Sequence, residues 1–226
     1  MRGKRARASW FQIAVASAPI KGLYAITDPQ LIGGERLLPA CEQALSGGAR
    51  ILQYRDKNAP RDELIKNGRA LKSLCEQYDA LLLINDDPIL AGDIGADGVH
   101  IGQTDGGIAN ARKHLGDRAI IGVTCHSDVQ LAQHAINHGA DYVAFGRFFA
   151  SHTKPHAPAA DIKVLSEPLF HNNRLVAKVA IGGVTPDNAP QLVRAGASAL
   201  AVIHALFASD DIEATARRFA RLFPED

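Results

Sequence analysis

The sequence predicts a single α/β domain folded as a (β/α)8 TIM barrel, and three observations indicate this. Strand-like apolar runs alternate with amphipathic or capped helical segments from residue 22 onward. Gly-Ala and Gly-Gly-Ala steps recur just before the strands, where glycine permits a left-handed helix end and a small residue allows a tight entry. Neither G-x-G-x-x-G nor G-x-x-x-x-G-K-[ST] occurs, which disfavours a doubly wound nucleotide-binding sheet.

Each expected strand is a short apolar run that ends in polar or turn residues. The eight runs are residues 23–27, 50–54, 81–84, 98–101, 120–124, 142–146, 175–181 and 199–203. The helical segments between and after them are residues 36–45, 61–77, 89–94, 108–115, 129–138, 161–170, 186–194 and 212–222. This strict alternation is the element order that a (β/α)8 barrel requires.

Composition restricts the class of partner. The chain has 226 residues, 46% of them hydrophobic, and a formal net charge of +1, which suits one well-cored domain. So small a net charge predicts no nucleic-acid partner, and a small phosphorylated ligand held by a few placed cations and backbone amides is expected instead. No apolar run is long enough for a membrane span, so no membrane partner is expected. The three widely spaced cysteines, Cys41, Cys75 and Cys125, predict reduced thiols and a cytoplasmic protein without disulfides.

Residues 1–21 are expected to form a disordered N-terminal extension, followed by the catalytic barrel at 22–226. The extension has a basic start and a short apolar patch, which superficially resemble a secretory signal. The patch is too short and contains Gln12, and the thiol pattern downstream gives no sign of an oxidising compartment.

Two predicted strands end in carboxylates. The run at 81–84 stops at Asn85, Asp86 and Asp87, and the run at 98–102 is followed after two residues by Asp105. Asp87 precedes Pro88 and is expected to cap a helix, whereas Asp86 has no such role. Asp105 precedes a glycine pair and would alone be explained equally well by a turn. Because the ends of parallel strands meet at one edge, Asp86 and Asp105 together predict an Mg²⁺ site.

Other strand ends carry groups suited to anions. Arg55 and Lys57 alternate after the second strand, as expected of a diphosphate clamp, although a solvated charged loop is the plain alternative. Thr124 ends the fifth strand and is suited to a phosphate oxygen. Its neighbour Cys125 is assigned no nucleophilic role, because adjacent strand residues point in opposite directions and pair poorly with a base. The loop after the sixth strand joins hydroxyls to Lys154, and glycines end the seventh strand, where barrels commonly bind phosphate.

These blocks together closely resemble the thiamine-phosphate synthase family over about residues 22–223. The matching blocks, in the family's order, are QYRDK at 53–57, NDD at 85–87, GVHIGQTD at 98–105, SHTKP at 151–155 and IGGV at 181–184. The resemblance implies a transferase of thiamine biosynthesis. It would join a hydroxymethylpyrimidine diphosphate to a thiazole phosphate, releasing diphosphate, and CO₂ where the thiazole carries a carboxylate. A dissociative displacement assisted by Mg²⁺ needs no protein nucleophile.

The resemblance also implies roles for particular residues, carried over position by position. Around the pyrimidine diphosphate it places Gln53, Tyr54, Arg55, Asp56, Lys57, Asn85, Thr124 and Lys154, of which Arg55, Lys57 and Lys154 are catalytic. Around the thiazole phosphate it places Ser151, His152, Thr153, Gly183, Ile203 and His204, and it assigns Asp86 and Asp105 to Mg²⁺. Two residues depart from the usual family pattern: Ser151 stands where threonine is frequent, and His204 where a small serine is frequent.

Two other functions compete. A thiazole tautomerase has a similar barrel but needs neither diphosphate nor metal, and the two carboxylates with the Arg55–Lys57 pair argue against it. A non-catalytic sensor of thiamine precursors would have no use for a complete metal and diphosphate constellation.

Overall fold

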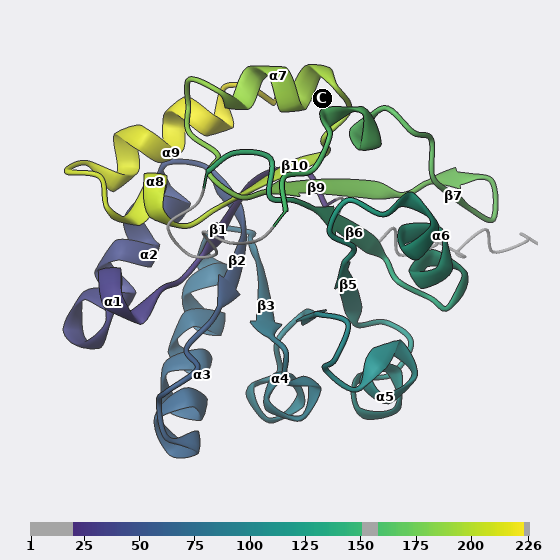
Figure 1. The fold of residues 1–226 in the computed structure, drawn as a ribbon. Coiled ribbons are helices and arrows are strands. Elements are labelled where there is room, and N and C mark those ends of the chain that lie inside the picture. The colour runs from purple at the N-terminus through teal and green to yellow at the C-terminus, as the bar shows by residue number, and fades with distance from the viewer. Residues whose placement is uncertain (1–19, 151–157, 224–226) are drawn as a thin grey trace, which may run out of the picture.

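The computed structural model describes residues 20–150 and 158–223. Eight parallel strands close into a barrel in the order β1-β10-β9-β6-β5-β4-β3-β2, with helices around its outside (Figure 1). The strands are β1 Gly22–Ile26, β2 Ala49–Tyr54, β3 Leu81–Asn85, β4 Gly98–Ile101, β5 Ile120–Thr124, β6 Tyr142–Phe145, β9 Ala177–Ile181 and β10 Ala199–Val202. The predicted (β/α)8 barrel is therefore confirmed.

Except between β6 and β9, the helices follow the predicted alternation, and there are two short additions. They are α1 Pro29–Ile32, α2 Leu37–Ser46, α3 Arg61–Gln77, α4 Pro88–Ile94, α5 Gly107–Leu115, α6 Val129–Asn137, α7 Ala189–Arg194, α8 His204–Phe207 and α9 Ile212–Ala220, with 3-10 turns at Gly34–Arg36 and Ile162–Leu165. The short helices α1 and α8 were not predicted, and α7 begins three residues after the predicted start at 186.

Alternation along the strands divides the apolar core into two layers. In β1, Tyr24 and Ile26 belong to a cluster that fills the barrel, while Leu23 and Ala25 belong to the larger cluster under the helices. This period of two is what parallel strands of a packed barrel require. A polar side chain at an inward position of a strand therefore lies inside the barrel or at its rim, where it can contact inward side chains of other strands.

The predicted helix at 161–170 is wrong. Asp161 does cap a turn, accepting a hydrogen bond from the Lys163 amide at 2.9 Å, but the turn is a 3-10 helix that ends at Leu165. Pro168 follows, and proline disfavours a continuing helix because it lacks an N–H and restricts the residue before it. The chain then forms a hairpin, β7 Phe170–His171 with β8 Arg174–Leu175, beside α6 (Figure 1).

The hairpin also shortens the predicted strand at 175–181, because Leu175 pairs with Phe170 and the barrel strand begins at Ala177. Asn172 and Asn173 make its turn with φ angles of 48° and 62°. Two consecutive residues with positive φ characterise the type I′ turn, for which asparagine is well suited.

The residues just before alternate strands stabilise the bottom of the barrel. Asp97 precedes β4 and accepts a hydrogen bond from the Leu82 amide of β3 at 2.8 Å. Asp141 precedes β6 and accepts from the Ile121 amide of β5 at 2.7 Å. Asp97 and Asp141 each follow a Gly-Ala step of the kind noted before the strands. These steps therefore supply both a left-handed helix end, as at Gly95 with φ 77°, and an acceptor for the neighbouring strand.

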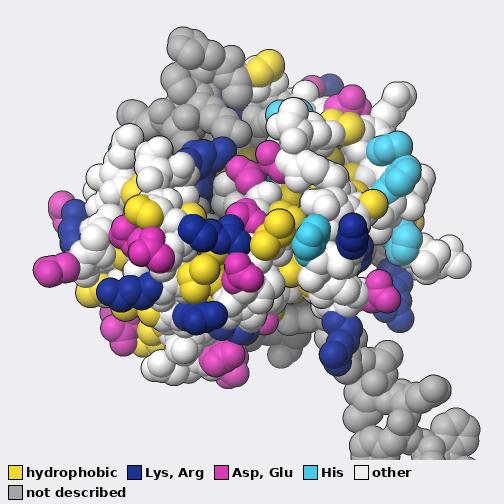
Figure 2. Space-filling model, turned by 90° about the horizontal axis from the view of Figure 1, so that it is seen from below, with side chains coloured by type: hydrophobic (Ala, Val, Ile, Leu, Met, Phe, Trp, Pro, Cys, Tyr) yellow, Lys and Arg dark blue, Asp and Glu magenta, His cyan; other side chains and the backbone are white. Residues whose placement is uncertain are grey.

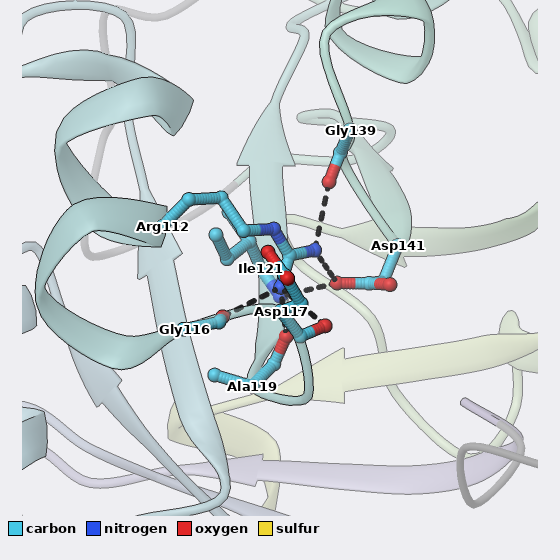
Figure 3. A network of polar contacts seen from close by, with 7 residues as sticks. All are labelled: Arg112, Gly116, Asp117, Ala119, Ile121, Gly139 and Asp141. Carbon is cyan, nitrogen blue, oxygen red and sulfur yellow. Dashed lines mark hydrogen bonds and ion pairs between the residues drawn. The ribbon is translucent and has the colours of Figure 1, made fainter. Parts of the chain in front are cut away.

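Arg112 of α5 gathers the loops at this face (Figure 3). Its guanidinium donates to the Gly139 carbonyl at 2.9 Å and to the Asp141 carboxylate at 2.7 Å, and also to the Ala119 carbonyl. The side chain is only 20% exposed, so these are largely desolvated charge-assisted bonds.

We expect Arg112→Ala to lower the free energy of unfolding by about 2–3 kcal/mol, because it leaves several carbonyls without this donor and takes the compensating charge from the partly buried Asp141 carboxylate, which keeps only the Ile121 amide. Arg218→Ala is the matched control: its ion pair with Asp187 has the same 2.7 Å separation, but the side chains are 56% and 87% exposed. Such a pair contributes at most about 1 kcal/mol. Urea denaturation measures both, and equal losses would contradict the role given to Arg112.

Candidate active site

The ends of β2, β3 and β4 bring a lysine and two carboxylates together at the C-terminal rim of the barrel. The Lys57 ammonium lies 3.0 Å from an Asp86 carboxylate oxygen. Asp86 has a positive φ of 64°, and its amide donates to the His100 carbonyl at 2.8 Å. A non-glycine residue in the left-handed region is held there at a cost of about 1 kcal/mol or more, an arrangement that is common at functional sites.

Asp86 is held as an anion. Burial by itself raises the pKa of its carboxyl, but hydrogen bonds with Lys57, Asp105 and Asn85 and the Lys57 charge outweigh burial, so the pKa is lowered below the ordinary value. Because Asp105 contributes to this lowering of the Asp86 pKa, the two carboxyl groups predicted to bind metal are neighbours.

Asp105 makes the turn that the sequence offered as one explanation of its position. One of its carboxylate oxygens accepts a hydrogen bond from the Gly102 amide at 2.7 Å, which closes the turn after β4. A side chain at position 102 would crowd that oxygen, since a Cβ there would lie 2.9 Å from it. This bond fixes the carboxylate beside Asp86 and uses only one of its two oxygens.

The neighbouring Asp87 has the structural role predicted for it. Its carboxylate accepts from the Leu90 amide at 2.8 Å, which caps α4, and it pairs with Arg61 at 2.5 Å. Asp86 and Asp87 are therefore adjacent carboxylates with separate surroundings.

Within residues 20–150 and 158–223, no group of three or more His, Cys, Asp and Glu side chains is arranged to hold a metal ion. A pair of carboxylates is nevertheless what Mg²⁺ commonly takes from a protein, because water and phosphate oxygens complete its shell. The donor set of Asp86 and Asp105 fits that ion.

Residues at the end of β2 divide between the two layers of the barrel. Gln53 points inward and is 2% exposed, whereas the Tyr54 side chain packs in the outer cluster under the helices at 3% exposed. The structure therefore separates the Tyr54 side chain from Gln53. Asp56 accepts from the Asn58 and Ala59 amides at 3.0 and 3.1 Å, which shapes the loop after the strand.

Thr27, which the sequence analysis did not single out as a site residue, fixes the position of Arg55. Its buried hydroxyl accepts from the Arg55 amide at 2.8 Å and lies 3.1 Å from the Arg55 carbonyl. The loop that carries Arg55 and Lys57 is thus tied to the end of β1.

Cys125, which was assigned no nucleophilic role, packs in the outer core cluster under the helices. Its side chain is fully buried, and burial raises the pKa of the thiol to about 12, so the nucleophilic thiolate is scarce at neutral pH.

Asn85 at the end of β3 lies beside His100 of β4 in the parallel register.

A hydrogen-bonded chain inside the barrel joins Gln53 to Thr124. The Gln53 amide nitrogen donates to the Tyr24 hydroxyl at 2.6 Å, and the Tyr24 and Tyr142 hydroxyls are 2.9 Å apart. His100 connects the rest, with Nδ1 2.9 Å from the Tyr142 hydroxyl and Nε2 2.8 Å from the Thr124 hydroxyl. We call these five residues the interior relay.

The inner three residues of the relay were missed as site residues because only strand ends were read for chemistry. Tyr24, His100 and Tyr142 lie within strands β1, β4 and β6. Their signal is readable from alternation: in β4, His100 stands between the apolar Val99 and Ile101, where an inward position carries a polar ring.

The thiazole-phosphate residues proposed from the resemblance are only partly described. Ser151, His152 and Thr153 lie outside the described residues, as does Lys154 of the pyrimidine-diphosphate set. Gly183 follows β9 with φ 66°, and a Cβ there would lie 2.2 Å from the Ala150 carbonyl oxygen, so only glycine fits against the loop after β6. Ile203 and His204 lie where β10 passes into α8.

Charged side chains of both signs are interspersed over the face seen in Figure 2, consistent with the formal net charge of +1. No helix in the described part of the chain has the length and apolar character needed to span a bilayer.

The fold and these strand ends place the protein in the class of (β/α)8-barrel enzymes whose site is built at the C-terminal rim. The family model described as thiamine monophosphate synthase matches residues 23–206. Thiamine-phosphate synthase of Alcanivorax borkumensis is 56% identical over 207 residues, covering 90% of this chain and 94% of that protein. The synthase of Marinobacter nauticus is 50% identical, with coverage of 89% and 90%.

Among solved structures, thiamine phosphate pyrophosphorylase from Pyrococcus furiosus superposes with a TM-score of 0.77 at 31% identity, covering 89% of this chain and 94% of that one. The chain belongs to the thiamine monophosphate synthase family. The resemblance seen in the sequence is thereby confirmed.

Proposed function

We propose that this protein joins 4-amino-2-methyl-5-(diphosphooxymethyl)pyrimidine to thiazole phosphate, or to its carboxylated form, giving thiamine phosphate and diphosphate, with CO₂ from the carboxylated substrate. The observation that carries the proposal is the cluster of Lys57, Asp86 and Asp105 at the ends of three adjacent strands. A carboxylate pair can ligate Mg²⁺, and a cation beside it can bind the oxygens of a diphosphate that the metal also contacts.

In the first half-site, Arg55, Lys57 and Lys154 bind the diphosphate. Gln53 and Asn85 contact the pyrimidine ring, and Thr124 contacts a phosphate oxygen of the same substrate. Gln53 and Thr124 are both polar ends of the interior relay, which supports their orientation toward one ligand. Tyr54 and Asp56 contribute through their backbone, because the Tyr54 ring packs under the helices and the Asp56 carboxylate holds its own loop.

Asp86 and Asp105 would hold Mg²⁺, as their two adjacent carboxylates suit it. When bound, the ion would neutralise charge on the diphosphate oxygens.

The second half-site binds the thiazole phosphate. It uses Gly183 and the backbone at Ile203 and His204, together with Ser151, His152 and Thr153. Support comes from the glycine at 183, which allows close backbone approach, and from the position of these segments after β9 and β10, the two strands that commonly form the phosphate site of barrels.

The chain's own residues act by electrostatics and positioning. As the bond between the pyrimidine methylene and the diphosphate oxygen breaks, negative charge accumulates on the leaving oxygens, and Arg55, Lys57 and Lys154 stabilise it. The electron-rich aminopyrimidine carries the positive charge until the thiazole nitrogen attacks. No thiolate is needed, in agreement with the buried Cys125. Such preorganised charges and aligned reactants supply most of the rate enhancement in sites of this kind.

We place the reaction in the cytoplasm. Cys41, Cys75 and Cys125 are all buried free thiols, as suits a reducing compartment.

A coupled assay tests the proposal. With both substrates and Mg²⁺, we expect one diphosphate released per thiamine phosphate formed, and no release when either substrate or the metal is withheld. Isomerisation of a thiazole without diphosphate release would favour a tautomerase, and tight binding without turnover would favour a sensor. Either result would contradict the proposed function.

A further inference from the structure

The interior relay is enclosed by the barrel and shaped to fit it. Tyr24 and Tyr142 are 1% and 0% exposed, so their hydroxyls have no access to bulk water. The Tyr142 ring packs edge-on to Tyr24 and stacked on His100, at centroid distances of 6.2 and 5.6 Å. Gly122 makes room for it, because a Cβ at that position would lie 1.9 Å from Tyr142 Cζ. Packing therefore fixes where each hydroxyl lies.

The relay crosses the barrel rather than following its wall. Tyr24 is on β1 and Tyr142 on β6, and two strands, β10 and β9, separate them in the closed order. Its outer members, Gln53 on β2 and Thr124 on β5, are both expected contacts of the pyrimidine diphosphate. Two parts of one half-site are thus connected through the core.

Counting protons gives the relay a direction. Burial raises the pKa of both Tyr24 and Tyr142, so each phenol keeps its single proton. The Tyr24 oxygen already accepts from the Gln53 amide, so its own proton is donated to Tyr142. The Tyr142 proton is then donated to His100 Nδ1.

The count continues to the end of the chain. Since His100 Nδ1 accepts, its Nε2 carries the proton and donates to the Thr124 hydroxyl oxygen. Thr124 consequently keeps its own proton for a partner outside the relay. At the other end, the amide nitrogen of Gln53 is used inside the relay, which leaves its carbonyl oxygen as the acceptor for a ligand.

We propose that the interior relay determines substrate specificity by fixing the polarity of its two ends. Gln53 offers an acceptor and Thr124 a donor, so the site selects a ring that bears an amino group near Gln53 and an anionic oxygen near Thr124. A ring with a carbonyl in place of the amine is rejected. This inference rests on the proposed function, in which an aminopyrimidine diphosphate occupies that half-site.

Rejection follows from the coupling of the five groups. To accept an oxo ring, the Gln53 amide must rotate so that its nitrogen faces the ligand and its oxygen faces the Tyr24 hydroxyl. A mismatch, with two donors or two acceptors facing each other, then arises somewhere in the relay unless every hydrogen bond in it reverses direction, and that reversal would turn Thr124 into an acceptor toward the anionic oxygen. Leaving one buried polar group unpaired costs enough to lower binding about tenfold to a hundredfold. Tyr24 and Tyr142 are positioning residues in this scheme, because they act through Gln53.

Equilibrium binding in the presence of Mg²⁺ tests the relay directly. The probes are 4-amino-2-methyl-5-(diphosphooxymethyl)pyrimidine and its 4-oxo counterpart, titrated calorimetrically into the protein without thiazole phosphate. The wild-type protein is expected to prefer the amino compound by at least about tenfold. Tyr142→Phe cuts the relay in the middle and frees the Gln53 amide to turn, so the preference should fall to about threefold or less.

Tyr78→Phe is the control, since it removes a tyrosine hydroxyl outside the relay, at the C-cap of α3, and should retain the wild-type preference. Tyr24→Phe removes a different hydroxyl of the relay and should repeat the Tyr142→Phe result, which guards against a folding defect in one variant. Thermal melting confirms that each variant is folded.

If folded Tyr142→Phe and Tyr24→Phe bind both compounds more weakly but keep the wild-type ratio of their dissociation constants, the relay contributes only to packing and the proposal is overturned. A wild-type preference for the oxo compound would also overturn it. Because binding is measured without turnover, a protein that discriminates the two compounds but releases no diphosphate would contradict the proposed function alone.

Discussion

Asp86→Asn is expected to lower kcat by about 10²–10³-fold or more, with Asp105→Asn producing a loss of similar size. Each change removes one negative charge from the carboxylate pair while preserving side-chain volume. Asp86 is the more informative position, because the backbone holds it at a φ of 64° that asparagine tolerates equally well. Loss of activity at this position therefore reports charge rather than backbone geometry.

Asp87→Asn is the matched control, and its kcat should stay within about threefold of the wild-type value. Asparagine caps helices as well as aspartate does, so the hydrogen bond to the Leu90 amide survives. Only the exposed ion pair with Arg61 weakens. Steady-state kinetics over a range of Mg²⁺ concentrations measures all three variants. Equal losses at Asp86, Asp87 and Asp105, with folding intact, would contradict the division between metal ligands and helix cap.

The barrel was predictable from the sequence because its signals are local. Each strand is an apolar run that stops at a polar residue, and each Gly-Ala-Asp step marks a strand start. The segment at 161–170 failed because an apolar pattern was given more weight than Pro168 and the Asn172–Asn173 pair, which favour a stop and a tight turn.

The carboxylates at the rim of the barrel could be predicted from the sequence, whereas the hydrogen-bonded residues in its interior could not. The Asp86 and Asp105 pairing follows from topology alone, because parallel strand ends meet at one edge. The interior relay depends on which side chains meet across the barrel, and Tyr24 and Tyr142 are 118 positions apart in sequence. No local pattern encodes that distance. Closure of the barrel brings them together.

The same reasoning separates the two layers at the end of β2. Sequence adjacency placed Gln53 and Tyr54 in one substrate-binding block, but a strand directs successive side chains to opposite faces. The structure accordingly places Gln53 in the relay and the Tyr54 ring under the helices. Motif membership alone does not distinguish a side-chain contact from a backbone contact.

Lys57→Ala is expected to lower kcat by about 10²-fold, or about 2.7 kcal/mol of transition-state stabilisation. The Lys57 side chain is 58% exposed and its ammonium lies 3.0 Å from the Asp86 carboxylate, beside the position where a metal-bound diphosphate would be received. Charge on the leaving diphosphate grows as its bond breaks, so an ammonium there stabilises the transition state more than the bound substrate. The KM for the pyrimidine diphosphate should therefore rise less than kcat falls, and the KM for thiazole phosphate should not change.

Arg61→Ala provides the comparison, because Arg61 is another cation, close to Lys57 in sequence, whose partners are Asp87 and Asp93 of the α4 segment. Its removal should change kcat by less than about threefold. Lys57→Arg should recover only part of the lost rate, since the planar guanidinium has a different reach and geometry. Single-turnover measurements decide the role: an unchanged chemical step in Lys57→Ala, with only weakened binding, would make Lys57 an anchor for the diphosphate rather than a group that stabilises its departure.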